Sequence, residues 1–193
     1  MIKPNNYENT QASGEFTPIE LGGHILEIKQ VEEMISKTGK QMLKVSYDTA
    51  KNDSQPSYFS ELFKNDIRPD KKWPANGTTY MLTEDNEGNC SRQLKTFTTS
   101  VEKSNVGFTT QWGDKFTECF KGKLVGGVFG IVEEEYNGDV KKKRPLRWFR
   151  SVEGINDVDI PEEKLLVNTI QPRVGSDGFQ SIPAGIDEEL PFN

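Results

Sequence analysis

An Asn137-Gly138 step between two strand-like runs is the feature that most constrains the fold of this chain. The run before it, residues 123–135, contains Leu-Val-Gly-Gly-Val-Phe-Gly-Ile-Val, and the run after it spans residues 139–152. Asn-Gly suits the positive φ angles of the tight turn that joins two antiparallel strands. Glycines inside the first run weaken a flat strand but suit one that bends sharply, as strands of small barrels do. We therefore expect a hairpin that belongs to a small barrel.

A second hairpin is predicted near the start of the chain. Residues 23–31 are a strand candidate, and the Ser-Lys-Thr-Gly-Lys turn at residues 36–40 offers a glycine where a positive φ is needed. The run 41–47 alternates at period two and places three apolar side chains on one face, namely Leu43, Val45 and Tyr47. A further strand is expected over residues 78–83.

The middle of the chain changes to helical periodicity. Residues 91–103 have apolar side chains at i, i+3 and i+7, which share one helix face: Leu94, Phe97 and Val101. A second short helix is predicted from the spacing of three aromatic residues, of which the first two are expected in the core: Trp112, Phe116 and Phe120.

Together these elements predict a mainly β fold with one or two short helices, an OB-fold-like small barrel. We place the barrel at residues 21–152, after an N-terminal arm of residues 1–20. Beyond Val152 apolar residues are scattered and prolines recur, which predicts an acidic flexible tail over residues 153–193.

Charge divides at the same boundary. The whole chain has a net charge of -6, but residues 153–193 hold nine acids and two bases, which leaves 22 bases and 21 acids in residues 1–152. A nearly neutral body with a strongly acidic tail is compatible with an anionic ligand, whereas a uniformly acidic protein is not.

Composition argues against an enzyme and against a cofactor or metal. The chain has one histidine, His24, and two separated cysteines, Cys90 and Cys119, which makes a zinc site improbable. No phosphate-binding loop, dinucleotide fingerprint or nucleophile elbow occurs. No apolar stretch is long enough to span a bilayer, and the first residues lack a signal core, so a cytoplasmic protein with free thiols is expected.

The strongest functional candidate is the run at residues 141–150, in which six of the ten residues are basic and two are aromatic. Cations neutralise phosphates and release counterions, and aromatic rings stack on unpaired bases. The run therefore predicts contact with single-stranded nucleic acid through Lys141, Lys142, Lys143, Arg144, Arg147, Trp148 and Arg150. A charged edge strand that resists aggregation is the alternative interpretation.

Two predicted loops add further candidates. Lys37 and Lys40 lie in the first hairpin turn, and Lys71, Lys72 and Trp73 precede a proline. A tryptophan beside two lysines suits a stacking platform for a base, and it suits equally a plug at the bottom of the barrel.

The C-terminal tip places three acids before an apolar residue, a proline and a phenylalanine. A buried phenylalanine with acids around it suits a basic-rimmed hydrophobic pocket on a partner protein. The candidate docking residues are Asp187, Glu188, Glu189, Leu190, Pro191 and Phe192. An ordinary solubilising tail is the alternative.

This tip resembles the acidic tail, ending in Pro-Phe, of bacterial single-stranded-DNA-binding proteins, although here Asn193 follows the phenylalanine. The body, from Gly22 through the turn at residues 36–40 to Val45, resembles a family of small phage-encoded proteins regarded as OB-fold single-strand binders. The resemblance implies sequence-independent binding of single-stranded DNA in replication or recombination. It also implies that the tail recruits replication or recombination proteins, and self-association is compatible with it.

Two other functions fit parts of the sequence. A non-catalytic phage inhibitor of a host protein would use the acidic tail as a decoy. A magnesium-dependent nuclease would use the carboxylates and lysine around the second hairpin turn, Glu133, Glu134, Glu135, Asp139 and Lys141.

Overall fold

The computed structural model describes residues 1–5, 7 and 17–166 of the chain. Its strands are β1 (Gly22–Ile35), β2 (Gln41–Thr49), β3 (Thr78–Leu82), β4 (Leu124–Phe129), β5 (Val132–Tyr136), β6 (Asp139–Lys143) and β7 (Leu146–Arg150). Its helices are α1 (Tyr58–Asn65) and α2 (Arg92–Ser104), with 3₁₀ turns at Ala75–Gly77, Glu118–Phe120 and Glu153–Ile155. No helix in this described part is long and apolar enough to cross a membrane.

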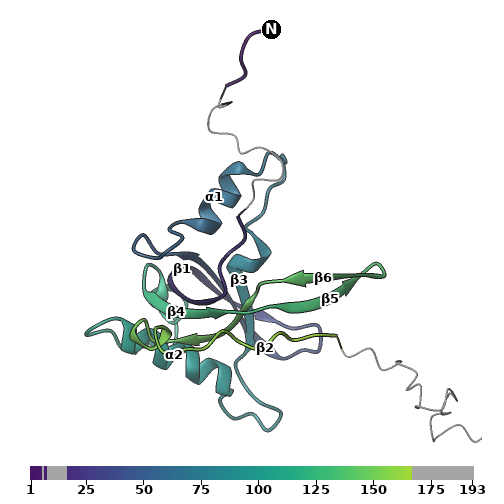
Figure 1. The fold of residues 1–193 in the computed structure, drawn as a ribbon. Coiled ribbons are helices and arrows are strands. Elements are labelled where there is room, and N and C mark those ends of the chain that lie inside the picture. The colour runs from purple at the N-terminus through teal and green to yellow at the C-terminus, as the bar shows by residue number, and fades with distance from the viewer. Residues whose placement is uncertain (6, 8–16, 167–193) are drawn as a thin grey trace, which may run out of the picture.

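Five strands form one curled antiparallel sheet in the order β3-β2-β1-β4-β7 (Figure 1). The long strand β1 has a register shift between Ile28 and Gln30, which lets it pair with β2 over most of its length and with β4 over its first part. Helix α2 lies in sequence between β3 and β4 and packs against β3, β4 and β7. The prediction of a mainly β, OB-like small barrel with short helices is confirmed.

The core lies inside the curled sheet. Leu43, Val45 and Tyr47 are all fully buried, as their period-two spacing predicts. Tyr47 stands at the centre, with its ring edge-on to Phe59 and Phe129 at 5.7 and 6.3 Å between centroids. Its hydroxyl donates to the carbonyl oxygen of Asn76 at 2.9 Å, and burial raises the pKa of the phenol.

Helix α1 depends on a carboxylate supplied by β2. Ser57, which precedes the helix, has a φ of 56° and makes no side-chain cap. The buried Asp48 accepts hydrogen bonds instead from the backbone N–H groups of Phe59 and Ser60, at 2.9 and 3.3 Å, and from the Ser60 hydroxyl. Because the first N–H groups of a helix lack intrahelical acceptors, Asp48 fixes the start of α1.

Helix α2 forms as predicted, whereas the second short helix predicted after it does not. Leu94, Phe97 and Val101 are buried, and Ser91 caps the helix by accepting from the N–H of Leu94 at 3.0 Å. The predicted second helix is wrong, because Gly113 has a φ of 81° and interrupts it, so that only a 3₁₀ turn remains. The expected core position of Trp112 is also wrong: its side chain is 66% exposed and stacks on the buried Phe116.

The predicted long hairpin divides into two pairs of strands. β4 pairs with β7 in the main sheet, and β5 pairs with β6 in a separate two-stranded sheet. The break falls where Gly130 donates to the carbonyl oxygen of Pro145 at 3.3 Å. At the tip, Asn137 and Gly138 have φ angles of 54° and 83°, which confirms the predicted turn.

The chain after β7 folds back over the glycine-rich strand. A Cβ on Gly126 would lie 2.6 Å from the carbonyl oxygen of Ser151, and one on Gly130 would lie 2.9 Å from Pro161. Lys164 then exchanges backbone hydrogen bonds with the start of β5, donating to Ile131 at 3.0 Å and accepting from Glu133 at 2.9 Å. The predicted body ends at Val152, whereas the chain beyond it still contacts the body through Ile155, Pro161 and the backbone of Lys164.

The body also begins earlier in the chain than predicted. Ile19 falls within the predicted N-terminal arm of residues 1–20, but it is 2% exposed and belongs to the core. The backbone N–H of Glu20 donates to the side chain of Gln55 at 2.7 Å. The last residues of the predicted arm therefore form part of the body.

The only histidine of the chain is buried in a polar junction. His24 places Nδ1 2.8 Å from the Asp53 carboxylate and Nε2 3.2 Å from the Glu20 carbonyl oxygen. Asp53 also accepts from the backbone N–H groups of Ile25 and Gln55. Burial alone would raise the pKa of Asp53, but the hydrogen bonds from His24, Gln55 and Ile25 outweigh it and hold the pKa below its ordinary value.

Replacing Asp48 with alanine is expected to lower the free energy of unfolding by about 1–3 kcal/mol, because the N–H groups of α1 lose their acceptor. Urea unfolding measures the change. The exposed Asp157→Ala is the matched control and should leave stability within about 0.5 kcal/mol of the wild type. Equal stability of the two variants would contradict this account of α1.

Asp53 should stabilise the fold in a pH-dependent way. Its pKa is lower in the folded chain than the unfolded value of about 3.9, so its contribution is complete above that value and is lost as the pH falls through the folded pKa. The difference in unfolding free energy between the wild type and Asp53→Asn should therefore shrink below about pH 4. A difference that stays constant from pH 7 to pH 3 would contradict it.

Candidate nucleic-acid interface

The β5–β6 hairpin projects from the barrel between β4 and β7 and carries three of the predicted lysines (Figure 1). Lys141, Lys142 and Lys143 are all exposed. Glutamates stand opposite them on β5, where Glu134 pairs with Lys141 and Glu133 pairs with Lys142. The charges of the lysines and the acids therefore nearly cancel over the whole hairpin, and the positive potential is confined to the surroundings of the lysine side chains.

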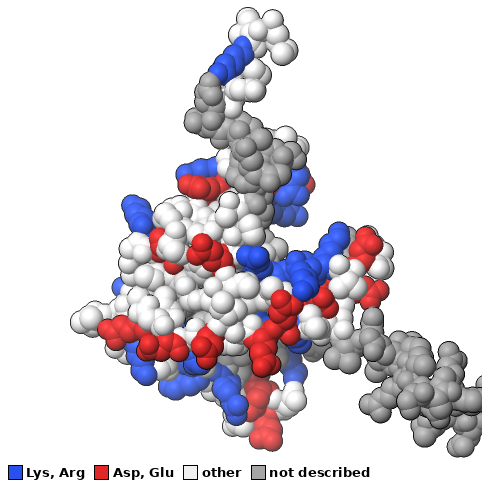
Figure 2. Space-filling model, in the orientation of Figure 1, with Lys and Arg blue, Asp and Glu red and all other residues white. Residues whose placement is uncertain are grey.

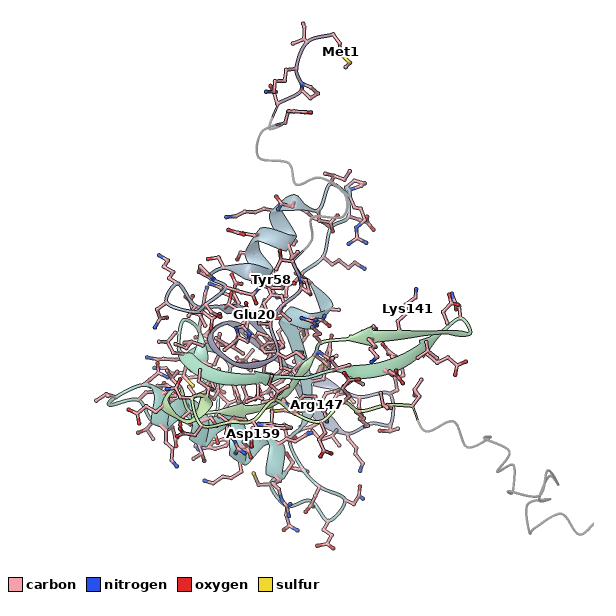
Figure 3. All side chains as sticks on the ribbon, viewed as in Figure 1. Met1, Glu20, Tyr58, Lys141, Arg147 and Asp159 are labelled. Atoms are coloured by element: carbon pink, nitrogen blue, oxygen red, sulfur yellow. The ribbon has the colours of Figure 1, made fainter. Side chains whose placement is uncertain are left out.

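Two of these lysines form ion pairs at the surface. Lys142 Nζ lies 2.7 Å from the carboxylate of Glu163, and Lys143 contacts Glu134. Both pairs are well exposed, so each contributes little to stability and can be exchanged for another anion. Figure 3 shows Lys141 extending from β6 on the side of α1.

Arg144 connects the base of the hairpin to the N-terminal part of the body. Its guanidinium donates to the carbonyl oxygen of Ile19 at 2.6 Å. It also lies near Tyr58 at the start of α1, where burial raises the pKa of the phenol and Arg144 partly offsets that rise. Arg144 thus joins the base of the hairpin to Ile19.

The predicted loop lysines lie in the segment that follows α1. Lys71 and Lys72 are exposed, and the ammonium of Lys71 sits 4.8 Å from the centre of the Phe63 ring. Figure 2 shows Lys and Arg side chains beside α1 and around the base of the hairpin, with acids at the hairpin tip. The structure therefore brings these two groups of cations to one side of the molecule.

Trp73 takes a structural position. Its side chain is half-buried and packs on Phe63, with 5.8 Å between ring centroids, and its indole N–H donates to the carbonyl oxygen of Gly77 at 3.0 Å. This geometry favours the plug interpretation over the stacking platform.

The turn between β1 and β2 carries the other two predicted lysines. Gly39 has a φ of 79°, as expected for this turn. Lys37 is exposed, and Lys40 donates to the side chain of Asn86 in the loop after β3. The turn is thereby joined to that loop, and Lys37 faces solvent.

The two aromatic side chains of β7 lie on opposite faces of the strand. Phe149 is in the core, whereas Trp148 is half-buried on the other face and its indole nitrogen has no hydrogen-bond partner among the described residues. Arg147 donates to the carbonyl oxygens of Ile131 and Glu162, each at 3.3 Å, so it serves to hold the returning chain. Arg150 is exposed.

β3 presents an exposed aromatic side chain that is not among the site residues predicted from the sequence. Tyr80 on β3 is 53% exposed and stands opposite Lys44 on β2. A hydrogen bond from Lys44 to Glu32 raises the pKa of that ammonium despite partial desolvation. The alternation with the buried Met81 next to it is the signal that identifies Tyr80 as outward-facing.

A separate hollow of about 930 Å³ lies where the β1–β2 hairpin faces the segment around Trp112. Its lining includes four acids, Glu32, Glu33, Glu84 and Asp114, and no lysine or arginine. Repulsion between these acids and phosphate makes this surface unsuitable for a nucleic-acid backbone.

Two further predictions concern metals and partners. Within residues 1–5, 7 and 17–166, no three histidine, cysteine or acidic side chains lie close enough together to hold a metal ion. The candidate docking tip, residues 187–192, lies outside the described residues and stays a prediction.

Replacing Trp73 with phenylalanine should lower the free energy of unfolding by about 1 kcal/mol, because the Gly77 carbonyl loses its donor. Affinity for oligo-dT should not change. The matched control, Trp112→Phe, removes an indole N–H from an exposed ring and should leave stability within about 0.5 kcal/mol of the wild type. Weaker oligo-dT binding by Trp73→Phe with unchanged stability would support the stacking platform instead.

Comparison with protein-family models and with curated proteins finds no match to this chain. The functional argument therefore rests on the fold and on the arrangement of these side chains.

Proposed function

We propose that this protein binds single-stranded DNA without sequence preference. The observation that carries the proposal is the position of the lysine-bearing hairpin in an OB-like barrel. In chain order the strands of the main sheet are β1, β2, β3, β4 and β7, so β4 and β7 are the fourth and fifth, and the β5–β6 hairpin connects them. OB folds hold oligonucleotides on their second and third strands and on the loops that follow the first and fourth.

The predicted cations occupy both of those loops. Lys37 and Lys40 lie in the loop after the first strand, and Lys141 to Arg144 lie in the loop after the fourth. Tyr80 is exposed on the third strand, which pairs with β2 and forms one edge of the sheet. In the proposed complex the lysines neutralise phosphates and Tyr80 stacks on a base. This argument from fold is an analogy, so it requires a direct test.

The resemblance of the tail extends the proposal to partners. In this proposal the tip at residues 187–192 recruits replication or recombination proteins, several copies of the chain coat one strand, and the protein acts in the cytoplasm of a phage-infected cell.

Fluorescence anisotropy of labelled oligo-dT, titrated with the full chain at several salt concentrations, tests the proposal. Binding should weaken steeply with salt. Lys141→Ala with Lys143→Ala should reduce the slope of log affinity against log salt by about 1.4, since each phosphate contact with a single strand contributes about 0.7. The control, Lys115→Ala with Lys121→Ala, removes two exposed lysines from the segment before β4 and should leave the slope unchanged.

Other outcomes identify the rival functions. Equal loss of slope in both double variants would show that the hairpin is not the binding surface. Magnesium-dependent shortening of the oligonucleotide would identify a nuclease. No affinity for DNA in the wild-type chain would overturn the proposal and favour an inhibitor of a host protein.

A further inference from the structure

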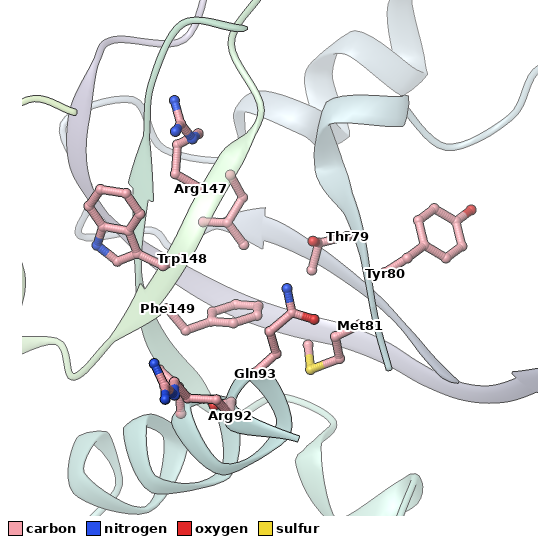
Figure 4. Close-up of a pocket in the computed structure, with 10 residues that line it drawn as sticks. Thr79, Tyr80, Met81, Arg92, Gln93, Arg147, Trp148 and Phe149 are labelled. Carbon is pink, nitrogen blue, oxygen red and sulfur yellow. The ribbon is translucent and has the colours of Figure 1, made fainter. Parts of the chain in front are cut away.

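The main sheet does not close on itself. β3 and β7 are its two edge strands, and the described residues form no backbone ladder between them. A pocket of about 200 Å³ lies in this seam, with the first turn of α2 at one end (Figure 4). Its apolar walls come from both edge strands, with Met81 on β3 and Leu146 and Phe149 on β7.

Two polar side chains line the pocket beside these apolar walls: Gln93 is exposed and Thr79 is half-buried. The Gln93 side chain rises from α2 into the space between Phe149 and Thr79, as Figure 4 shows. The side chains of Gln93 and Thr79 make no hydrogen bond to any other described residue, so an amide and a hydroxyl are available to a ligand. Arg92, next to Gln93 in the first turn of α2, is exposed and adds a positive charge at the rim.

We infer that this seam binds one unpaired nucleobase, an inference that rests on the proposed function. A base has two apolar faces and a polar edge, which match the apolar walls and the Gln93 amide. A phosphodiester group alone would leave the walls unused. An aliphatic peptide side chain would fill the walls but could make no hydrogen bond to Gln93 or Thr79.

The chemistry of the amide fits a strand of any sequence. A primary amide presents a donor and an acceptor side by side, and rotation of the group exchanges them. Gln93 can therefore pair with the edges of different bases. The seam also adjoins the surface proposed for the strand, because the exposed Tyr80 lies on β3 and Leu146 follows the hairpin.

The test compares oligo-dT with an abasic oligonucleotide that has the same number of phosphates, using the full chain. The wild type should bind oligo-dT more tightly. Gln93→Leu keeps a similar size but removes the amide, and it should weaken oligo-dT binding about fivefold, the equivalent of one net hydrogen bond. Affinity for the abasic strand, and the salt slope for both ligands, should not change.

Two further variants make the result specific. Thr79→Val removes the hydroxyl at nearly constant shape and should weaken oligo-dT binding in the same selective way. Gln111→Leu makes the same substitution at an exposed glutamine near Trp112, outside the seam, and should have no effect.

The outcomes separate the two proposals. The seam does not hold a base if the wild type binds oligo-dT and the abasic strand equally. The same follows if Gln93→Leu and Thr79→Val weaken the binding of both strands equally, or of neither. Single-strand binding stands in all of these cases. If the wild type binds neither strand, single-strand binding itself fails. Selective loss in both seam variants, with Gln111→Leu unchanged, establishes the site.

Discussion

Close contact between the sheet and the chain that follows β7 is the constraint on which the rest of the structure depends. Gly23 and Gly126 leave room for Ile155, and Gly130 leaves room for Pro161. A methyl group at any of these positions would collide with backbone or with a buried side chain. Because the returning chain then bonds to the start of β5, the same contact fixes where the β5–β6 hairpin leaves the barrel.

The electrostatic surface that results is distributed over several segments. Glutamates on β5 and the residue Glu163 offset much of the charge of the lysines on β6, and Arg144 and Arg147 are held by backbone carbonyls. The cationic character of this side of the molecule therefore depends on the segment after α1 as much as on the hairpin. An acid-lined hollow occupies another surface, so charge distinguishes two regions of a body that is almost neutral overall.

The sequence was sufficient where one local rule determines the outcome. Period-two spacing identified the buried face of β2, helical spacing identified the buried face of α2, and Asn137-Gly138 identified the turn. It was insufficient where contacts with distant segments determine the position or the burial of a residue. The packing of Ile155 depends on Gly23 and Gly126, which lie far away in the chain. The same limit applies to Trp73, whose burial depends on its contacts with Phe63 and Gly77. The helix that the aromatic spacing favoured fails for a local reason, because Gly113 has a positive φ.

The unpaired edges of β3 and β7 have a mechanical consequence. A closed barrel has a circumference fixed by backbone hydrogen bonds, and widening it requires that some of them break. Among the described residues no backbone ladder joins β3 to β7, and α2 packs against both strands, so a small change in sheet twist alters the width of the barrel while every ladder stays intact. The barrel is therefore most compliant along one line, and its stiffness there is set by packing density rather than by backbone geometry.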